Sequence, residues 1–334
     1  MARQVVLHVG AMKSGTTYLQ DLLFVNKQAL SEQGVLVAGA THGDQARAVD
    51  DLRGQRSTEA TRGAWGRLVH EIDAHPGTAV VSVELLAPAR PEVVDEVGKA
   101  FGDCTVVVTA RDLNRSLASM WQETVQNGRS WHFDEYVEGA RCARPRPERR
   151  PEDVNAAGRT FWRQQNIVRL CRNWGRVAPV KLVTVPPPTS PASLLPERFL
   201  SILGVPAANL APPPQANARI GAASAMVLRR MNALLSAQGL DYPARAAVRK
   251  AFLAKRVMAE RAASEPHIGL SVAPWTREHA AVMVTRLKEL DVELVGEWSD
   301  LDPVAVPGVD PRAIPSDEVI EAAVVALAAL VTRG

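Results

Sequence analysis

The sequence has few cysteines, little net charge and no apolar run long enough to cross a membrane. Its cysteines, Cys104, Cys142 and Cys171, are far apart and form no C-x-x-C pair, which argues against a disulfide framework or a zinc site and favours a reducing cytoplasm. The net charge of +3 gives no reason to expect a nucleic-acid partner. The apolar tail IEAAVVALAALV at 320–331 is about 12 residues long, whereas a membrane span needs roughly 20. We therefore expect no membrane partner, and a terminal helix that packs on the core or on a second copy in a homodimer.

Short apolar runs alternate with helical patterns over the first half of the chain, which is typical of β-α-β units and a parallel sheet. The strand-like runs are QVVLHVG at 4–10, TAVVSVELL at 78–86, CTVVVTAR at 104–111 and PVKLVTV at 179–185. The first run is too short for a signal peptide and ends in a glycine loop. Beyond Pro191 the pattern is mostly helical, and no repeat or polar linker divides the chain. We expect one α/β domain over residues 1–334, with a core sheet at roughly 4–186 and a mainly helical part at 190–334.

The stretch GAMKSGTT at 10–17 lacks a lysine where its glycine spacing calls for one. In the phosphate-binding loop of nucleoside triphosphatases, G-x-x-x-x-G-K-[ST], the lysine follows the second glycine. Here Gly10 and Gly15 keep the spacing, but Thr16 follows and the lysine is Lys13, inside the loop. Glycines let backbone N–H groups turn toward an anion, the following helix adds its positive end, and Thr16 and Thr17 add hydroxyl donors. The alternative is a plain glycine turn between a strand and a helix.

This loop resembles the 5′-phosphosulfate loop of the sulfotransferases that use 3′-phosphoadenosine-5′-phosphosulfate (PAPS). Residues 13–17, KSGTT, match the family's P-K-[ST]-G-T-T without a gap, and Met12 stands where the family usually has proline. The resemblance implies an α/β fold with a P-loop NTPase-like parallel sheet flanked by helices and a helical C-terminal portion. It also implies that the phosphosulfate is held by Lys13, Ser14, Gly15, Thr16 and Thr17.

A second stretch, ARDLNRSLASMW at 110–121, follows the third strand-like run. The family has an arginine at this strand end and a serine eight positions later, which clamp the 3′-phosphate of the cofactor, and Arg111 and Ser119 match them. The spacing is physically reasonable because Arg111 leaves the carboxyl edge of the sheet while Ser119 lies two turns along the next helix. Looser likeness to the bacterial carbohydrate-type and natural-product-type branch runs through WQETVQNGR at 121–129, VTVPPP at 183–188, LLPERFLSILG at 194–204, NARIG at 217–221 and LVGEWSDL at 294–301.

Four other residues and one stretch are candidates for binding the cofactor or the acceptor. Cytosolic family members touch the 3′-phosphate with an arginine-lysine-glycine stretch, and ARIG at 218–221 is a partial match, so the resemblance adds Arg219 and Gly221. Trp121 and His132 could contact the acceptor, although core packing is the commoner fate of a tryptophan on a helix. The arginine-rich stretch 141–150 could attract an anionic acceptor or be solvated surface charge.

Two residues carry the chemistry that the resemblance implies. The family places a histidine or a glutamate at the end of the second core strand, and Glu84 stands there, so we expect Glu84 to take the acceptor proton. A capping or salt-bridging role is the alternative, and His8, the competing base, is inside a strand, where a satisfied core histidine is commoner. Lys13 is expected to stabilise charge on the departing phosphate. Magnesium is not required, because the hydroxyl residue that follows a P-loop lysine is missing in that form.

The sequence thus predicts a cytoplasmic PAPS-dependent sulfotransferase. It would move the sulfuryl group to a hydroxyl or amine of a small-molecule or carbohydrate acceptor and release adenosine-3′,5′-bisphosphate (PAP), without a metal. Two alternatives stay open: a P-loop small-molecule kinase or other phosphotransferase, and a non-catalytic nucleotide or polyanion binder that uses the arginine-rich stretch. The acceptor is not predicted, because acceptor pockets are built from variable loops and helices.

Overall fold

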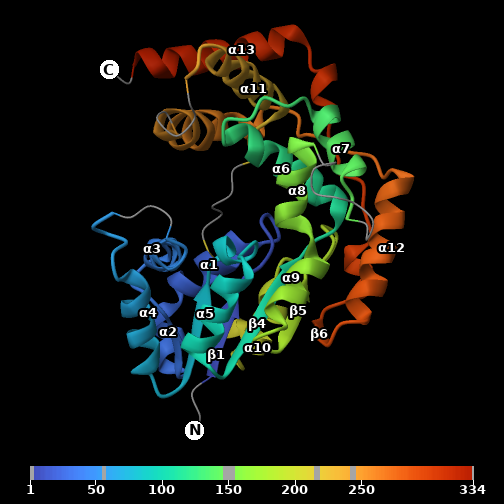
Figure 1. The fold of residues 1–334 in the computed structure, drawn as a ribbon. Coiled ribbons are helices and arrows are strands. Elements are labelled where there is room, and N and C mark those ends of the chain that lie inside the picture. The colour runs from blue at the N-terminus through green and yellow to red at the C-terminus, as the bar shows by residue number, and fades with distance from the viewer. Residues whose placement is uncertain (1–3, 55–57, 146–154, 214–218, 241–245, 333–334) are drawn as a thin grey trace. The chain divides into compact units, whose positions relative to one another are not determined.

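Six parallel strands form one sheet in the order β2-β3-β1-β4-β5-β6. The computed structural model describes residues 4–54, 58–145, 155–213, 219–240 and 246–332 (Figure 1). The strands are β1 (Gln4–His8), β2 (Val35–Val37), β3 (Thr78–Ser82), β4 (Cys104–Ala110), β5 (Val180–Thr184) and β6 (Val292–Val295). β1 lies inside the sheet between β3 and β4, so the loop that follows it leaves from the interior of the carboxyl edge.

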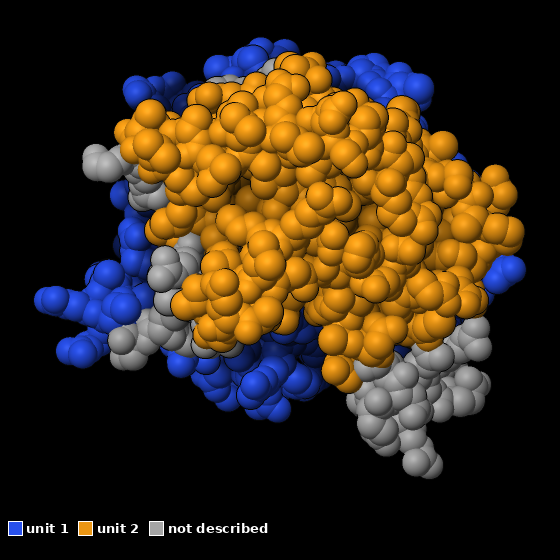
Figure 2. All heavy atoms as spheres, turned by 90° about the horizontal axis from the view of Figure 1, so that it is seen from above, with its two compact units in different colours: residues 1–112, 163–214, 278–302 blue, residues 113–162, 215–277, 303–334 orange. Residues whose placement is uncertain are grey.

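The chain forms two compact units, which Figure 2 colours separately. Unit 1 comprises residues 1–112, 163–214 and 278–302 and contains the whole sheet. Unit 2 comprises residues 113–162, 215–277 and 303–334, and its regular elements are helices. Each unit is therefore assembled from separate stretches of the chain.

The helices follow this division. Those of unit 1 are α1 (Thr16–Val25), α2 (Lys27–Glu32), α3 (His42–Leu52), α4 (Ala64–Asp73), α5 (Pro91–Phe101), α9 (Ile167–Trp174) and α10 (Leu194–Ile202), with the short helices η1 (Glu84–Leu86), η3 (Ala207–Asn209) and η7 (Trp298–Leu301). Those of unit 2 are α6 (Leu113–Gln126), α7 (Phe133–Cys142), α11 (Ala222–Ala237), η5 (Ala247–Met258), η6 (Arg261–Ala263), η8 (Pro311–Ala313) and α13 (Ser316–Val331). Helices α8 (Ala156–Gln165) and α12 (Pro274–Lys288) have residues in both units.

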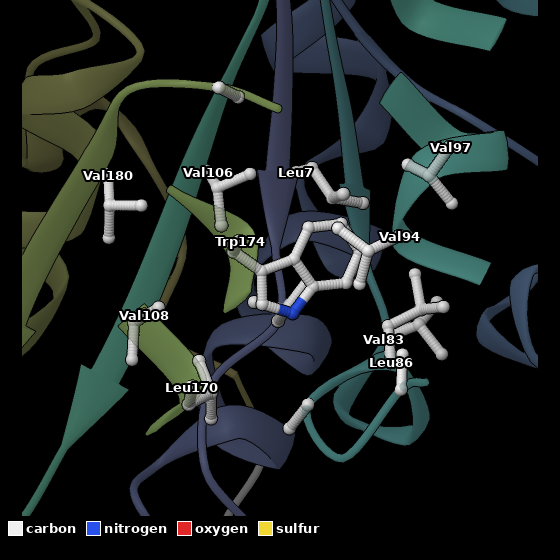
Figure 3. Packing of buried hydrophobic residues seen from close by; sticks show 14 of the residues in the cluster. Leu7, Val83, Leu86, Val94, Val97, Val106, Val108, Leu170, Trp174 and Val180 are labelled. Carbon is white, nitrogen blue, oxygen red and sulfur yellow. The ribbon is translucent and has the colours of Figure 1, made fainter. Parts of the chain in front are cut away.

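The sheet is buried on both faces, which explains the nearly unbroken apolar run of β1. On one face, Leu7 belongs to a cluster that includes residues of α5 and α9, and Figure 3 shows Trp174 of α9 beside Val94 of α5. On the other face, Val6 belongs to a cluster that includes Leu19, Leu22 and Leu23 of α1 and Phe199 and Leu200 of α10. Successive side chains of a strand point to opposite faces, so β1 supplies both layers.

The fold confirms the expected α/β class and parallel sheet, and it corrects the expected extent of the sheet. The expected sheet ended near residue 186, but β6 adds an edge strand at Val292–Val295, and β2 adds another at Val35–Val37. Both are short edge strands, which give little periodicity to detect. Helices α8 and α9 are separated at Asn166, whose side chain accepts a hydrogen bond from the Arg169 N–H and so begins α9.

The apolar tail is a helix, α13, as expected. Its Val319, Ala322 and Ala326 are buried, and α13 packs on α11, whereas Ile320, Val324, Leu327 and Val331 are exposed. The homodimer expected from this tail stays a prediction. No helix among the described residues is both long enough and apolar enough to cross a membrane.

Candidate anion-binding site

The topology of unit 1 singles out one place at the carboxyl edge of the sheet. The connection that leaves β1 leads toward β2 on one side, whereas the connection that leaves β4 leads toward β5 on the other. The crevice between two adjacent strands whose connections diverge is where open α/β sheets bind ligands. The loop 9–15 follows β1 and Arg111 follows β4, so both stretches leave the sheet at this crevice.

The loop after β1 is held along β4 before it turns into α1. The Val9 N–H donates to the Val107 carbonyl, and the Ala11 N–H donates to the Thr109 carbonyl at 3.1 Å. The Ser14 N–H then donates to the Ala11 carbonyl at 3.2 Å, which closes a turn that contains Lys13. The loop backbone is thus tied to the sheet up to the turn.

The turn has an alternating backbone of the kind that gathers N–H groups. Lys13 has φ 65° and Gly15 has φ 83°, whereas Ser14 between them is not in the left-handed region. Among the described residues, Lys13 is the only non-glycine residue with a positive φ. Residues of alternating hand aim successive N–H groups into one concavity, which is an anion-binding nest. A lysine in this conformation costs about 1–2 kcal/mol, so other contacts must hold it there.

The amino end of α1 adds to this positive concavity. Within the described residues, α1 has no side-chain cap and no acidic residue in its first turn. The N–H groups of Thr16, Thr17 and Tyr18 have no carbonyl partner inside the helix, since the first N–H groups of any helix lack one. The helix dipole adds partial positive charge at the same end. This end of α1 therefore suits an anion.

Each of the two loop glycines has a structural reason. A Cβ on Gly10 would lie 1.8 Å from the Thr109 hydroxyl oxygen and 2.7 Å from His8 Nε2. A Cβ on Gly15 would lie 2.7 Å from a methyl carbon of Leu195 on α10, and its φ is positive. Glycine is thus required at position 10 by steric contact and favoured at position 15 by the left-handed backbone.

Ser14 points into the protein and not toward the concavity. Its side chain is 1% exposed, its hydroxyl donates to the Ala11 carbonyl, and its oxygen lies 2.7 Å from the Thr109 hydroxyl. Thr109 in turn lies 3.1 Å from His8 Nε2, and His8 Nδ1 lies 2.7 Å from the Ser82 hydroxyl. Ser14 therefore shapes the loop, because both its hydroxyl and its N–H are engaged inside the protein.

His8 is a core histidine, as the sequence suggested. It is 1% exposed, and burial lowers its pKa to about 3, since the charged imidazolium is poorly solvated there. It is neutral at neutral pH and has both ring nitrogens engaged. These properties argue against His8 as the base.

Glu84 lies next to the loop. It begins η1 two residues after the end of β3, is half-buried, and accepts a hydrogen bond from the Thr16 hydroxyl at 2.6 Å. Thr16 is buried and has one hydroxyl proton, which it gives to Glu84, whereas Thr17 is exposed. The sequence predicted Glu84 and Thr16 as members of one site, and the structure brings them into contact.

Gln165 belongs to this site although no motif indicated it. Its Nε2 donates to the Met12 carbonyl at 2.6 Å, and its side chain is 6% exposed. It stands at the end of α8, immediately before the break at Asn166. The loop has Met12 where the family that it resembles in sequence usually has proline, and a buried amide restrains this residue by its carbonyl. The only sequence signal would have been Asn166 directly after it, a residue type that commonly begins a helix.

Arg111 is half-buried and stands one residue beyond β4, in unit 1. Its neighbours are set by the sheet, because the Val185 N–H donates to the Ala110 carbonyl on one side and the Ala11 N–H to the Thr109 carbonyl on the other. Ser119, its predicted partner, is half-buried on α6 in unit 2. The clamp formed by Arg111 and Ser119 stays a prediction from their spacing.

The two acceptor candidates of unit 2 have structural roles. Trp121 is fully buried, its Nε1 donates to the Trp131 carbonyl at 3.0 Å, and its ring meets Phe133 edge-on. His132 is exposed and is the N-cap of α7, in a capping box with Glu135. Trp121 therefore belongs to the core, which is the alternative that the sequence left open.

Gly221 is the N-cap of α11, and the end of that helix already holds a carboxylate. Glu265 accepts hydrogen bonds from the Ser224 N–H at 2.8 Å and the Ser224 hydroxyl at 2.7 Å. A Cβ on Gly221 would lie 2.2 Å from the Glu265 Cβ, so glycine is needed for this approach. Arg219 is exposed. This geometry gives Gly221 a packing role and lends no support to phosphate binding there.

Of the arginine-rich stretch 141–150, residues 146–150 lie outside the described residues. Arg141 is part of α7 and pairs with Glu138 on the same helix. The described residues contain no cluster of three or more histidine, cysteine, aspartate or glutamate side chains that could hold a metal ion.

No protein-family model, no curated protein and no solved structure matches this chain. A function is therefore inferred from the arrangement of groups in unit 1. This arrangement consists of a fixed loop that gathers N–H groups, a lysine inside this loop and a carboxylate beside it. Such a set of groups can bind a phosphate-like anion and take a proton from a nearby nucleophile.

Proposed function

We propose that the protein is a PAPS-dependent sulfotransferase with a P-loop NTPase-like fold. The observation that carries the proposal is the left-handed Lys13 within a nest-shaped loop, directly before the uncapped amino end of α1. A lysine inside the loop is close in sequence to these N–H groups and would meet the leaving phosphate. The interior position of β1 in the strand order supports the P-loop-like part of the proposal.

The residues present fit a phosphosulfate. Lys13, the N–H groups of residues 15–17 and the Thr17 hydroxyl would hold its 5′ side. Arg111 would hold the 3′-phosphate together with Ser119, as the sequence predicts. All these donors are cationic or neutral, which suits an anion bound without a bridging metal.

When bound, PAPS supplies an activated sulfuryl group whose bond to phosphate breaks as the acceptor atom bonds to sulfur. Lys13 stabilises the negative charge that appears on the departing phosphate. Glu84 accepts the proton that the acceptor hydroxyl or amine loses, and the Thr16 hydroxyl fixes one of its oxygens. The acceptor is a small molecule or carbohydrate, and the expected compartment is the cytoplasm.

Calorimetry with PAP in the presence of a chelator tests the proposal. We expect PAP to bind without metal and 5′-AMP to bind about 10- to 150-fold more weakly, because a charge-assisted hydrogen bond contributes about 1.5–3 kcal/mol. The variant Arg111→Met should bring the two affinities close together, while Arg115→Met, an arginine just inside α6, serves as a matched control. Equal affinity of the unmodified protein for PAP and 5′-AMP would refute the assignment.

The same titrations separate the alternatives. Tight binding of ATP that depends on magnesium would identify a P-loop kinase or other phosphotransferase. Affinity for polyanions that falls steeply with salt, with no sulfuryl transfer to any acceptor, would identify a non-catalytic binder.

A further inference from the structure

A continuous chain of buried hydrogen bonds runs beneath the anion loop. It links Ser82 at the end of β3, His8 at the end of β1, Thr109 near the end of β4 and Ser14 in the loop. The exposed fractions of these four side chains are 0%, 1%, 0% and 1%. The chain ends on the Ala11 carbonyl, the acceptor that also closes the turn around Lys13.

The direction of every bond follows from that last acceptor. A carbonyl cannot donate, so the single Ser14 hydroxyl proton goes to Ala11, and Ser14 must accept from Thr109. Thr109 has then used its own proton and must accept from His8, which requires a proton on Nε2. His8 Nδ1 is left as an acceptor for the Ser82 hydroxyl. The network therefore fixes His8 as the neutral Nε2–H tautomer.

The residues of this hydrogen-bonded series are in steric contact with the anion loop as well as hydrogen-bonded to it. Gly10 lies so close to Thr109 and His8 that a side chain at position 10 would displace both. Gly10 of the loop thus packs against the Thr109 hydroxyl, and Ser14 of the loop is hydrogen-bonded to the same hydroxyl. A strained residue such as Lys13 persists only where its surroundings restrain it from several directions.

We propose that His8 and Thr109 are positioning residues of the anion loop, which hold Ser14 so that Lys13 stays in its left-handed conformation. They touch no ligand and act through Ser14. The effect on cofactor affinity rests on the proposed function, but the effect on the loop does not. Loss of the Thr109 hydroxyl should leave the fold intact, because valine has the same shape, and should release Ser14.

The test compares Thr109→Val with Thr109→Ser, which keeps the hydroxyl, and with Thr105→Val. Thr105 is the matched control because it is a buried threonine on the same face of β4, four residues earlier. Two readouts need no ligand: the His8 tautomer from nitrogen NMR of histidine-labelled protein, assigned with His8→Gln, and hydrogen exchange of the Ser14 amide. The third is PAP affinity by calorimetry.

We expect the Nε2–H tautomer in the unmodified protein. In Thr109→Val the Ser14 amide should exchange at least tenfold faster and PAP should bind roughly tenfold more weakly, whereas Thr109→Ser and Thr105→Val stay within about threefold. An Nδ1–H tautomer, or equal Ser14 exchange in Thr109→Val and Thr105→Val, overturns the inference. If Thr109→Val fails to fold, two measurements still test the inference. They are the His8 tautomer in the unmodified protein and hydrogen exchange of the Ser14 amide in His8→Gln.

The two proposals fail separately. If the unmodified protein does not bind PAP but Thr109→Val loosens Ser14, the cofactor assignment is wrong and the positioning role stands. If PAP binds equally well to Thr109→Val and to the unmodified protein, the cofactor assignment stands and the positioning role is wrong.

Discussion

Replacing Lys13 by glycine should weaken cofactor binding and stabilise the fold at the same time. At φ 65° an L-residue costs about 1–2 kcal/mol, which glycine does not pay. Glycine loses more chain entropy on folding than alanine does, by roughly 0.5–1 kcal/mol. The net expectation is that Lys13→Gly is more stable than Lys13→Ala by about 0.5–1 kcal/mol. The comparison with alanine matters because both variants lose the ammonium group and differ only in backbone preference.

Native-state hydrogen exchange of the β1 amides measures this difference, since β1 is in the core of unit 1. Calorimetry with PAP measures the other half, and both variants should lose about 10- to 150-fold in affinity. Lys13→Arg is the control that keeps a positive charge. Equal stability of the glycine and alanine variants would show that residue 13 is not left-handed in solution. Unchanged affinity in both would show that its ammonium does not touch the cofactor.

Three further changes test neighbouring groups. Replacing Glu84 by glutamine should lower turnover about 10²- to 10⁴-fold and leave PAP affinity within a few-fold; unchanged turnover would place the base elsewhere. Replacing Gln165 by glutamate removes the donor to Met12 and should weaken PAP binding roughly tenfold, whereas Gln164→Glu on the same helix should not. His8 has a pKa of about 3 in the fold, so between that value and its ordinary pKa of 6.5 only the unfolded chain takes up the proton. The free energy of unfolding should therefore decrease as the pH is lowered below 6.5, by roughly 1.4 kcal/mol per pH unit. Denaturant unfolding of His8→Gln at pH 7 and pH 5 should lack this contribution. Parallel pH profiles of the unmodified protein and His8→Gln would contradict it.

The sequence predicted the parts of the fold that have strong local patterns. β1, β3, β4 and β5 are apolar runs bounded by glycine, proline or polar residues, and their burial on both faces makes such runs necessary. β2 and β6 lie at the two edges of the sheet, and their three and four residues carry too little pattern to be recognised.

The sequence indicated the loop and Glu84 as members of the candidate site, but neither Gln165 nor the directions of the side chains. The motif KSGTT places two serine or threonine hydroxyls around the loop glycine, yet Ser14 points inward to Thr109 and Thr16 points to Glu84. These directions depend on partners 95 and 68 residues away, which a local pattern does not contain. Gln165 is further still, and only the folded chain brings it to Met12.

The late position of β6 in the chain bears on how the protein is made. A ribosome releases β5 by Thr184, but the strand that covers its edge ends at Val295, after most of unit 2 has been synthesised. At about 5–20 residues per second, the nascent chain carries β5 as an uncovered edge for roughly 5–20 s. An uncovered edge is a template for pairing with another chain. Newly made molecules therefore pass through an interval in which aggregation through the β5 edge competes with completion of the sheet by β6. Any truncation before residue 292 makes that interval permanent.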